Sequence, residues 1–333
     1  MTKPLALALG DPAGIGPEIV CASWARRKSD GLPPFFAVGG HDVLAAAAQL
    51  ANISCPVQRV ADMREALAVF DDALPVLGDR DANYRPGAPD PDGAKLALHS
   101  LEIATHLARE GDAGAVVTSP VAKSELKRIG FDHPGQTEYL ASACLLDPEQ
   151  AVMMLAGPSL RAVPLTVHCA LAQVPALLTR ELIVGRGIIV ARALRTDFGI
   201  DAPRIAVTGL NPHAGEGGQF GAEERDVIEP AIAALRDAGV DASGPHPADA
   251  LFAPHKRAGF DAALCMYHDQ ALIPVKALDF DQGVNVTLGL PIVRTSPDHG
   301  TAFDIAGRGI ARPEAMIAAI RMAGEMAERR ARA

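Results

Sequence analysis

The sequence predicts an α/β protein built on largely parallel sheets. Short apolar, β-rich runs alternate with alanine-rich helical stretches along the 333 residues, and this alternation is typical of βαβ units. The predicted strands are apolar throughout, which favours strands covered by helices on both faces. Three of these runs lead directly to a histidine, and the carboxyl ends of strands in α/β proteins are where ligands bind.

The individual elements follow from hydrophobic periodicity and from turn residues. The predicted strands are Leu5–Leu9, Phe35–Val38, Ala115–Thr118, Val152–Leu155, Val163–Val167, Ile205–Thr208, Ala262–Met266 and Ile292–Arg294. The predicted helices are Pro17–Arg27, Asp42–Ala51, Asp92–Glu110, Glu138–Leu145, Thr179–Thr196, Ala222–Ala238 and Pro313–Arg330.

Length and composition predict two domains, because 333 residues with 49% hydrophobic content exceed what one core usually holds. We expect a hinge near Gly130–Gly135 and a C-terminal helix that returns to the first unit. The first α/β domain is therefore expected to be discontinuous, with residues 1–130 and about 306–333. The second is expected to hold residues of about 131–305.

Charge and hydropathy exclude several classes of partner. The formal net charge of -9 argues against nucleic acid. No apolar stretch reaches the length of a membrane span, and the N-terminus lacks the layout of a signal peptide. We therefore expect a cytoplasmic protein. Its five cysteines show no paired spacing, which indicates reduced thiols.

His168, His213 and His268 each follow an apolar run, and they are 45 and 55 residues apart. No short motif has such spacings, so a shared site would have to be assembled by the fold. Three imidazoles suit zinc, and other divalent ions also accept this ligand set. The alternative is that each is an ordinary core or surface histidine.

Cations and polar residues mark a candidate anion site. Lys276 and Arg294 lie among apolar neighbours, and a buried cation needs a partner. A substrate phosphate would supply one, with Asn285 as a neutral donor. Internal salt bridges with local aspartates are the alternative. Gln136 and Thr137 precede a helix and either bind a polar substrate or simply cap that helix.

Two further turns each have two possible interpretations, an anion-binding site or an ordinary structural turn. The glycine-rich turn Gly10–Glu18 follows the first predicted strand and opens a helix, although its spacing is not the G-x-G-x-x-G fingerprint. Residues 118–123, which read Thr-Ser-Pro-Val-Ala-Lys, likewise join a strand to a helix.

Four segments together resemble one family, the 4-hydroxythreonine-4-phosphate dehydrogenases (PdxA) of the pyridoxal phosphate pathway. They are Gly10–Glu18, Asn211–Glu216, Tyr267–Gln270 and Thr295–Ala302, within a resemblance that runs from about residue 5 to about residue 325. The resemblance implies a fold like that of isocitrate and isopropylmalate dehydrogenases. It also implies homodimers of two-domain subunits, NAD or NADP in the interdomain cleft, and an active site near the subunit interface built from both subunits.

The resemblance also assigns residues. It implies that His168, His213 and His268 bind a divalent metal (zinc, magnesium or cobalt), and that Lys276, Asn285, Arg294 and Thr137 bind the substrate. Gln136 stands where the family usually has a histidine, and its amide still donates a hydrogen bond to substrate without carrying charge. Asp269 is the candidate for orienting a metal-bound imidazole or for taking a proton.

The implied reaction is the NAD(P)-dependent oxidation of 4-phosphooxy-L-threonine to 2-amino-3-oxo-4-phosphooxybutanoate, which decarboxylates to 3-amino-2-oxopropyl phosphate. This step belongs to pyridoxal 5'-phosphate (vitamin B6) biosynthesis, and its substrate is a small phosphorylated amino acid. One alternative is a D-threonate or D-erythronate 4-phosphate dehydrogenase of the same family. Others are a phosphotransacetylase-like acyltransferase and a non-catalytic protein that binds a phosphorylated metabolite.

Overall fold

The structure, a computed structural model, describes residues 3–332. These residues form two compact units, each with its own core. Unit 1 contains residues 3–148 and 290–332, and unit 2 contains residues 149–289. The chain leaves unit 1 after helix α6 (Gln136–Ala143), later than the Gly130–Gly135 turn. Ring contact between Phe131 and Tyr139, with centroids 5.9 Å apart, holds α6 to the segment before it.

The strands of unit 1 run parallel in the order β3-β4-β2-β1-β5-β12. Every residue of β1, β2, β5 and β12 is buried, as expected for strands covered on both faces. The strands are β1 (Leu5–Ala8), β2 (Phe35–Val38), β3 (Val57–Val60), β4 (Leu74–Leu77), β5 (Val116–Thr118) and β12 (Arg294–Pro297).

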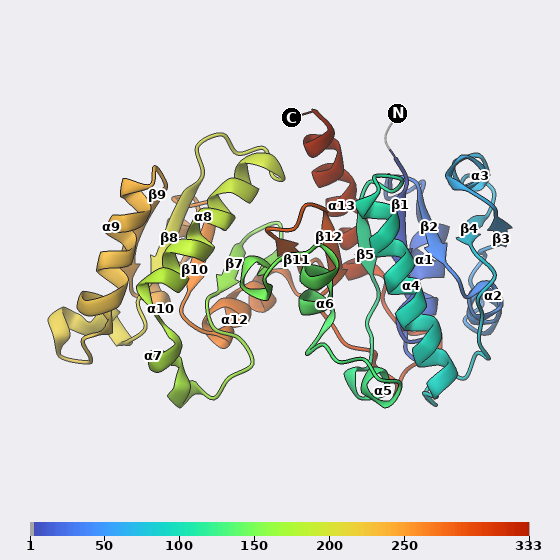
Figure 1. Ribbon diagram of the computed structural model, residues 1–333, viewed down its shortest axis with the longest axis horizontal. Coiled ribbons are helices and arrows are strands. Elements are labelled where there is room, and N and C mark those ends of the chain that lie inside the picture. The colour runs from blue at the N-terminus through green and yellow to red at the C-terminus, as the bar shows by residue number, and fades with distance from the viewer. Residues whose placement is uncertain (1–2, 333) are drawn as a thin grey trace. The chain divides into compact units, whose positions relative to one another are not determined.

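Helices pack against these strands within unit 1 (Figure 1). Helix α4 contacts β1, β2 and β5, whereas α13 contacts β1, β5 and β12. Helix α4 begins at Pro91 because Asp90 caps it by accepting from the Gly93 N–H at 2.8 Å. Besides α6, the helices are α1 (Gly16–Ala25), α2 (His41–Leu50), α3 (Met63–Val69), α4 (Pro91–Arg109), α5 (Lys123–Arg128) and α13 (Glu314–Arg332).

The strands of unit 2 form a mixed arrangement in the order β11-β6-β7-β10-β8-β9. Strands β7, β10, β8 and β9 are parallel, whereas β6 is antiparallel to both β7 and β11. The carboxyl ends of β7, β8 and β10 therefore share one edge. The strands are β6 (Val152–Ala156), β7 (Arg161–Pro164), β8 (Arg204–Thr208), β9 (Asp241–His246), β10 (Ala262–Cys265) and β11 (Val284–Leu288).

Helix α12 packs on β6, β7 and β10 of unit 2, where Leu272 and Val275 join a core with Ala263 and Cys265. Helices α8 and α9 lie side by side (Figure 1), and Gly187 permits this approach because a Cβ there would lie 2.7 Å from Leu235. The helices are α7 (Val174–Leu177), α8 (Arg180–Thr196), α9 (Glu229–Asp237), α10 (Ala248–Leu251), α11 (Pro254–Arg257) and α12 (His268–Asp279), with short turns η1 (Pro148–Gln150), η2 (Leu171–Gln173), η3 (Pro212–Gly218) and η4 (Glu224–Ile228).

The predicted α/β class is confirmed, and one local prediction is wrong. The strand expected at Ile292–Arg294 instead begins at Arg294, where β12 starts. The segment after His268 was not among the predicted helices but forms α12, which contains Pro274, a residue that is unusual inside a helix. Strands β3, β4, β9 and β11 were not predicted. Two of these, β3 and β9, are exposed or polar and lack an apolar run.

No helix between residues 3 and 332 is long and apolar enough to cross a membrane. All five cysteines carry free thiols.

Candidate functional site

The three predicted metal-binding histidines all lie in unit 2, after the carboxyl ends of parallel strands. His168 follows β7, His213 follows β8 within η3, and His268 follows β10 as the first residue of α12. The sequence placed the histidines at one edge of a sheet, and their positions in unit 2 agree with that placement.

His168 and His268 lie side by side. Their ring centroids are 5.9 Å apart, and both line a pocket of about 330 Å³. This volume suits a small ligand rather than a macromolecule. The other lining residues are Thr166, Val167, Cys169, Leu171, Val174, Tyr267 and Asp269.

Asp269 holds the His268 ring in a defined orientation. Nδ1 of His268 lies 2.7 Å from Oδ1 of Asp269. An ionised carboxylate only accepts hydrogen bonds, so Nδ1 is the donor, and in that neutral tautomer the lone pair lies on Nε2. Carboxylates commonly orient metal-binding imidazoles in this way. The geometry therefore favours the orienting role among the two that the sequence left open for Asp269.

His213 lies in a left-handed segment of the backbone. Residues 213–217 have φ angles of 53, 51, 78, 42 and 67° in turn. Such angles are costly for residues other than glycine, and strained backbone of this kind clusters at functional sites. Nδ1 of His213 lies 3.1 Å from Oε2 of Glu216, while the His213 side chain is 65% exposed. His168 also has a positive φ, of 42°.

A buried carboxylate anchors the base of this left-handed segment. Oε1 of Glu224 accepts hydrogen bonds from the backbone N–H groups of Leu210 and Asn211, both at 2.8 Å. Its Oε2 accepts from Nδ2 of Asn211 at 3.0 Å. Gly215 passes so close that a Cβ there would lie 2.6 Å from Oε2. Glu224 therefore sets the path of the chain on both sides of His213.

Glu224 was not among the candidate residues predicted from the sequence, although its place in the helical pattern is a signal for it. Glu224 precedes Ile228 and Leu235 at helical spacing, and all three are buried. An acidic residue on the apolar face of a helical pattern must find polar partners inside the protein. An acidic residue at such a position is therefore expected to make specific hydrogen bonds inside the protein, as Glu224 does.

The three histidines do not converge on one point within a single chain. Within residues 3–332, only one group of three or more histidine, cysteine or acidic side chains places its donor atoms within 4.8 Å of one another. That group is His41, Asp42 and Asp81, in unit 1, and it was not among the predicted ligands.

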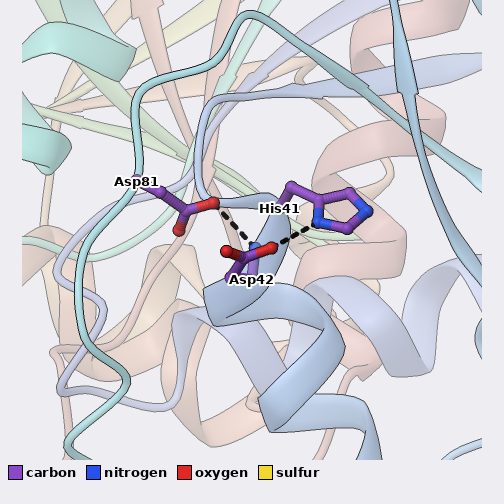
Figure 2. A group of neighbouring side chains, drawn as sticks. All are labelled: His41, Asp42 and Asp81. Carbon is purple, nitrogen blue, oxygen red and sulfur yellow. Dashed lines mark hydrogen bonds and ion pairs between the residues drawn. The ribbon is translucent and has the colours of Figure 1, made fainter.

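The group in unit 1 has a structural explanation (Figure 2). Asp81 accepts from the backbone N–H groups of Asp42 and Val43, at 2.8 and 3.3 Å, and so anchors the start of α2. Nη2 of Arg59 lies 3.4 Å from Asp42 and 3.2 Å from Asp81. The hydrogen bond from His41 lowers the pKa of Asp42. The start of α2 and a guanidinium already engage these carboxylates, so we assign no metal here.

Arg294, one of the predicted substrate-binding residues, is buried in unit 1. It is 4% exposed, and its Nη2 donates to Oγ1 of Thr118 at 2.7 Å and to Oε1 of Gln136 at 3.2 Å. Burial lowers the pKa of Arg294 to about 10, while Glu138 acts in the opposite direction. The structure thus brings together Arg294 and Gln136, which lie 158 residues apart.

Gln136 and Thr137 form the start of α6, where backbone N–H groups favour an anion. Nε2 of Gln136 donates to the Ser119 carbonyl at 3.4 Å. Lys123 is close by, because a Cβ on Gly135 would lie 3.3 Å from its Nζ. The turn that contains residues 118–123 therefore lies beside the start of α6.

Lys276 and Asn285 lie in unit 2. Lys276 is exposed on α12, so the expectation that it is a buried cation is wrong; its apolar neighbour Ile273 is itself 63% exposed, and of residues 273–275 only Val275 is buried. Asn285 lies in β11, and its Oδ1 is buried without a hydrogen-bond partner among the described residues. Such an atom is costly unless a ligand or water satisfies it.

Comparison with known proteins gives a consistent result over the whole chain. A family model described as "Pyridoxal phosphate biosynthetic protein PdxA" matches residues 32–323. The 4-hydroxythreonine-4-phosphate dehydrogenase of Erythrobacter litoralis is 68% identical, over 99% of this chain and 98% of its own length. That of Methylorubrum populi is 52% identical, over 98% and 95%. The crystal structure of 4-hydroxythreonine-4-phosphate dehydrogenase from Klebsiella pneumoniae has a TM-score of 0.88 and 38% identity, covering 98% of each chain.

Proposed function

Because the chain belongs to the PdxA family of pyridoxal phosphate biosynthetic proteins, we propose that it oxidises 4-phosphooxy-L-threonine with NAD or NADP. The alcohol loses a hydride to the nicotinamide and a proton to a base, which gives 2-amino-3-oxo-4-phosphooxybutanoate. Loss of CO₂ from this β-keto acid gives 3-amino-2-oxopropyl phosphate. The observation that carries the proposal is the placement of three histidines at one strand edge of unit 2.

The histidines suit a divalent metal. In His268, Nδ1 is engaged by Asp269 and Nε2 keeps its lone pair, and in His213, Nδ1 lies against Glu216. His168 shares the pocket with His268. Neutral imidazoles of this kind bind zinc, cobalt and, with substrate oxygens, magnesium. When bound, such an ion supplies Lewis acidity that lowers the pKa of a substrate hydroxyl.

The remaining candidates would bind the substrate. Arg294 offers a guanidinium held in place by Thr118 and Gln136, which suits a phosphate or carboxylate. Thr137 and Gln136 add the start of α6. In unit 2, Asn285 has a buried acceptor to satisfy, and Lys276 is an exposed cation whose ammonium suits an anionic substrate group.

We propose that the protein acts as a homodimer through unit 2. Seven of the eleven large hydrophobic side chains exposed in the described chain belong to that unit, which concentrates apolar surface there. Phe280 is 75% exposed, Leu171 66% and Ile273 63%. Because the three histidines do not converge within one chain, the metal site is completed across the subunit interface. We expect this enzyme in the cytoplasm.

A substrate panel tests the function. Purified protein is assayed with 4-phosphooxy-L-threonine, D-threonate 4-phosphate and D-erythronate 4-phosphate, each with NAD⁺ and with NADP⁺, by following absorbance of the reduced nicotinamide. Divalent metal is quantified in the same sample. We expect the largest kcat/KM with the amino acid, and loss of activity after chelation that returns on adding metal.

Other outcomes of the panel identify the alternatives. Faster turnover of either phosphorylated sugar acid indicates the sister activity. Acyl transfer to inorganic phosphate, without nicotinamide reduction, indicates an acyltransferase. Binding of metal and substrate without any turnover indicates a binding protein. Full activity in chelator would refute the metal-dependent mechanism.

A further inference from the structure

A single side chain, Gln270, joins two of the strand ends that carry the histidines. It lies two residues after His268, in the first turn of α12. Its Oε1 accepts hydrogen bonds from the backbone N–H of Met266 and from Oγ1 of Thr208, both at 2.7 Å. Its Nε2 donates to the Gly209 carbonyl at 2.8 Å. Gln270 therefore spans from the end of β10 to the end of β8.

These contacts fix both the orientation of the amide and the spacing of the strand ends. A backbone N–H only donates and a carbonyl only accepts, so one orientation of the Gln270 amide satisfies all three groups. Thr208 and Met266 are fully buried. Leaving a buried polar group unsatisfied costs about 1–3 kcal/mol, so a change in the spacing of β8 and β10 is opposed.

The third histidine-bearing segment joins the same network. Oγ1 of Thr166, two residues before His168, donates to the Met266 carbonyl at 2.8 Å. The main chain of Met266 is thus tied to Gln270 through its N–H and to Thr166 through its carbonyl. The three histidine segments are therefore connected through Thr166, Met266, Gln270 and Thr208.

From these contacts we infer that Gln270 is a positioning residue for the proposed metal centre. It sets the relative placement of the backbone that carries His213 and the backbone that carries His268, and so fixes how each subunit presents these segments to metal sites that are completed across the interface. The inference rests on the proposed function, since it concerns the same histidines. Groups that orient metal ligands from outside typically contribute about 10–100-fold in metal affinity, and Gln270 is expected to fall in that range.

Two substitutions of graded severity test the inference in the full-length protein. Gln270→Met removes all three hydrogen bonds at similar volume, and Thr208→Val removes only the hydroxyl that donates to Oε1. Zinc affinity is measured by competition with a chelator, and the visible absorption of the Co²⁺-loaded protein reports ligand geometry. We expect about 10–100-fold weaker zinc binding for Gln270→Met, a smaller loss for Thr208→Val, and altered Co²⁺ bands in both.

Ser100→Ala is the matched control. Oγ of Ser100 accepts from the Leu9 N–H at 2.8 Å and donates to the Val38 carbonyl at 2.7 Å, so it ties the ends of β1 and β2 in unit 1. Ser100 is fully buried. Its loss should lower the melting temperature by an amount similar to that of the Gln270 variant, while zinc affinity and the Co²⁺ spectrum stay unchanged.

The outcomes separate the inference from the proposed function. Wild-type protein that binds neither zinc nor cobalt overturns the metal centre, and the role of Gln270 falls with it. Wild-type binding that Gln270→Met leaves intact, with only a lower melting temperature, overturns the positioning role alone. If Gln270→Met does not fold, Thr208→Val decides by the same criterion. Light scattering on each variant verifies that a change in oligomeric state does not account for the loss.

Discussion

Two groups of histidine and carboxylate side chains in this protein differ in how their donor atoms are already used. In unit 1, His41, Asp42 and Asp81 lie within 4.8 Å of one another, but helix α2 and Arg59 occupy their oxygens. In unit 2, His168, His213 and His268 are farther apart, yet Asp269 and Glu216 engage only the Nδ1 atoms of two of them.

The contrast shows that proximity of donor atoms is a poor guide to a metal site. In a cluster of opposite charges the side chains pair with one another, because each carboxylate is stabilised by a nearby cation or N–H group. Its oxygens are then already engaged and are poor candidates for binding a metal. In His213 and His268, by contrast, the carboxylate contacts are made through Nδ1, and Nε2 is the ring nitrogen that would face a metal. The group with the longer distances is therefore the better candidate.

Removing a histidine of unit 2 should have the largest effect. His268→Ala or His213→Ala is expected to abolish tight metal binding. It should lower kcat by more than about 100-fold, the upper range for changes to residues that only orient a metal ligand. The measurements are metal content after dialysis and steady-state turnover. His41→Ala serves as the control and should retain both. Loss of metal in His41→Ala, with retention in the other two, would reverse the comparison.

Arg294→Lys should have the next largest effect. An ammonium is a compact point charge on a different stem and does not reproduce the planar guanidinium, whose Nη2 donates to both Thr118 and Gln136. Losing one charge-assisted hydrogen bond costs about 2 kcal/mol, or about 30-fold in kcat/KM. Metal content should not change. Arg26→Lys, which alters a surface arginine paired with Asp30 and Glu314, should leave kcat/KM unaltered, and an equal loss in both variants would contradict a specific role.

Alanine substitutions at two glycines of the left-handed segment distinguish backbone strain from a steric clash with Glu224. Gly215 and Gly217 have φ angles of 78 and 67°, so alanine at either costs about 1–2 kcal/mol of stability. A Cβ on Gly215 would also lie 2.6 Å from Glu224, whereas a Cβ on Gly217 meets nothing within 4 Å. We expect weaker metal binding in Gly215→Ala than in Gly217→Ala, measured by chelator competition. Equal affinities would mean that Glu224 does not position His213.

The smallest effect is expected from Asp81→Ala. It removes the acceptor of two N–H groups at the start of α2, which should cost about 1 kcal/mol of unfolding free energy. Chemical denaturation measures this loss. Metal content and turnover should match those of the wild type, since the cluster holds a helix rather than an ion. Loss of bound metal would show that the cluster binds one after all.

Much of the site was predictable because apolar runs in the sequence locate the strands, and the site residues follow the ends of those strands. The apolar runs before His168, His213 and His268 fix strand positions, and parallel strands bring their carboxyl ends to one edge. Arg294 was expected to be buried because it lies within an apolar run, and it is. Lys276 was misplaced because the helix of residues 268–279 was not foreseen, and helical periodicity turns its side chain outward.

The sequence by itself therefore determined the α/β class, the strand-end histidines and the buried Arg294, since these depend on hydrophobic periodicity over a few residues. Only the tertiary structure decided which polar side chains meet. Gln270 reaches Thr208 across 62 residues, and Arg294 reaches Gln136 across 158. Such pairs depend on strand order and register, and no local pattern in the chain encodes the distance between segments that far apart.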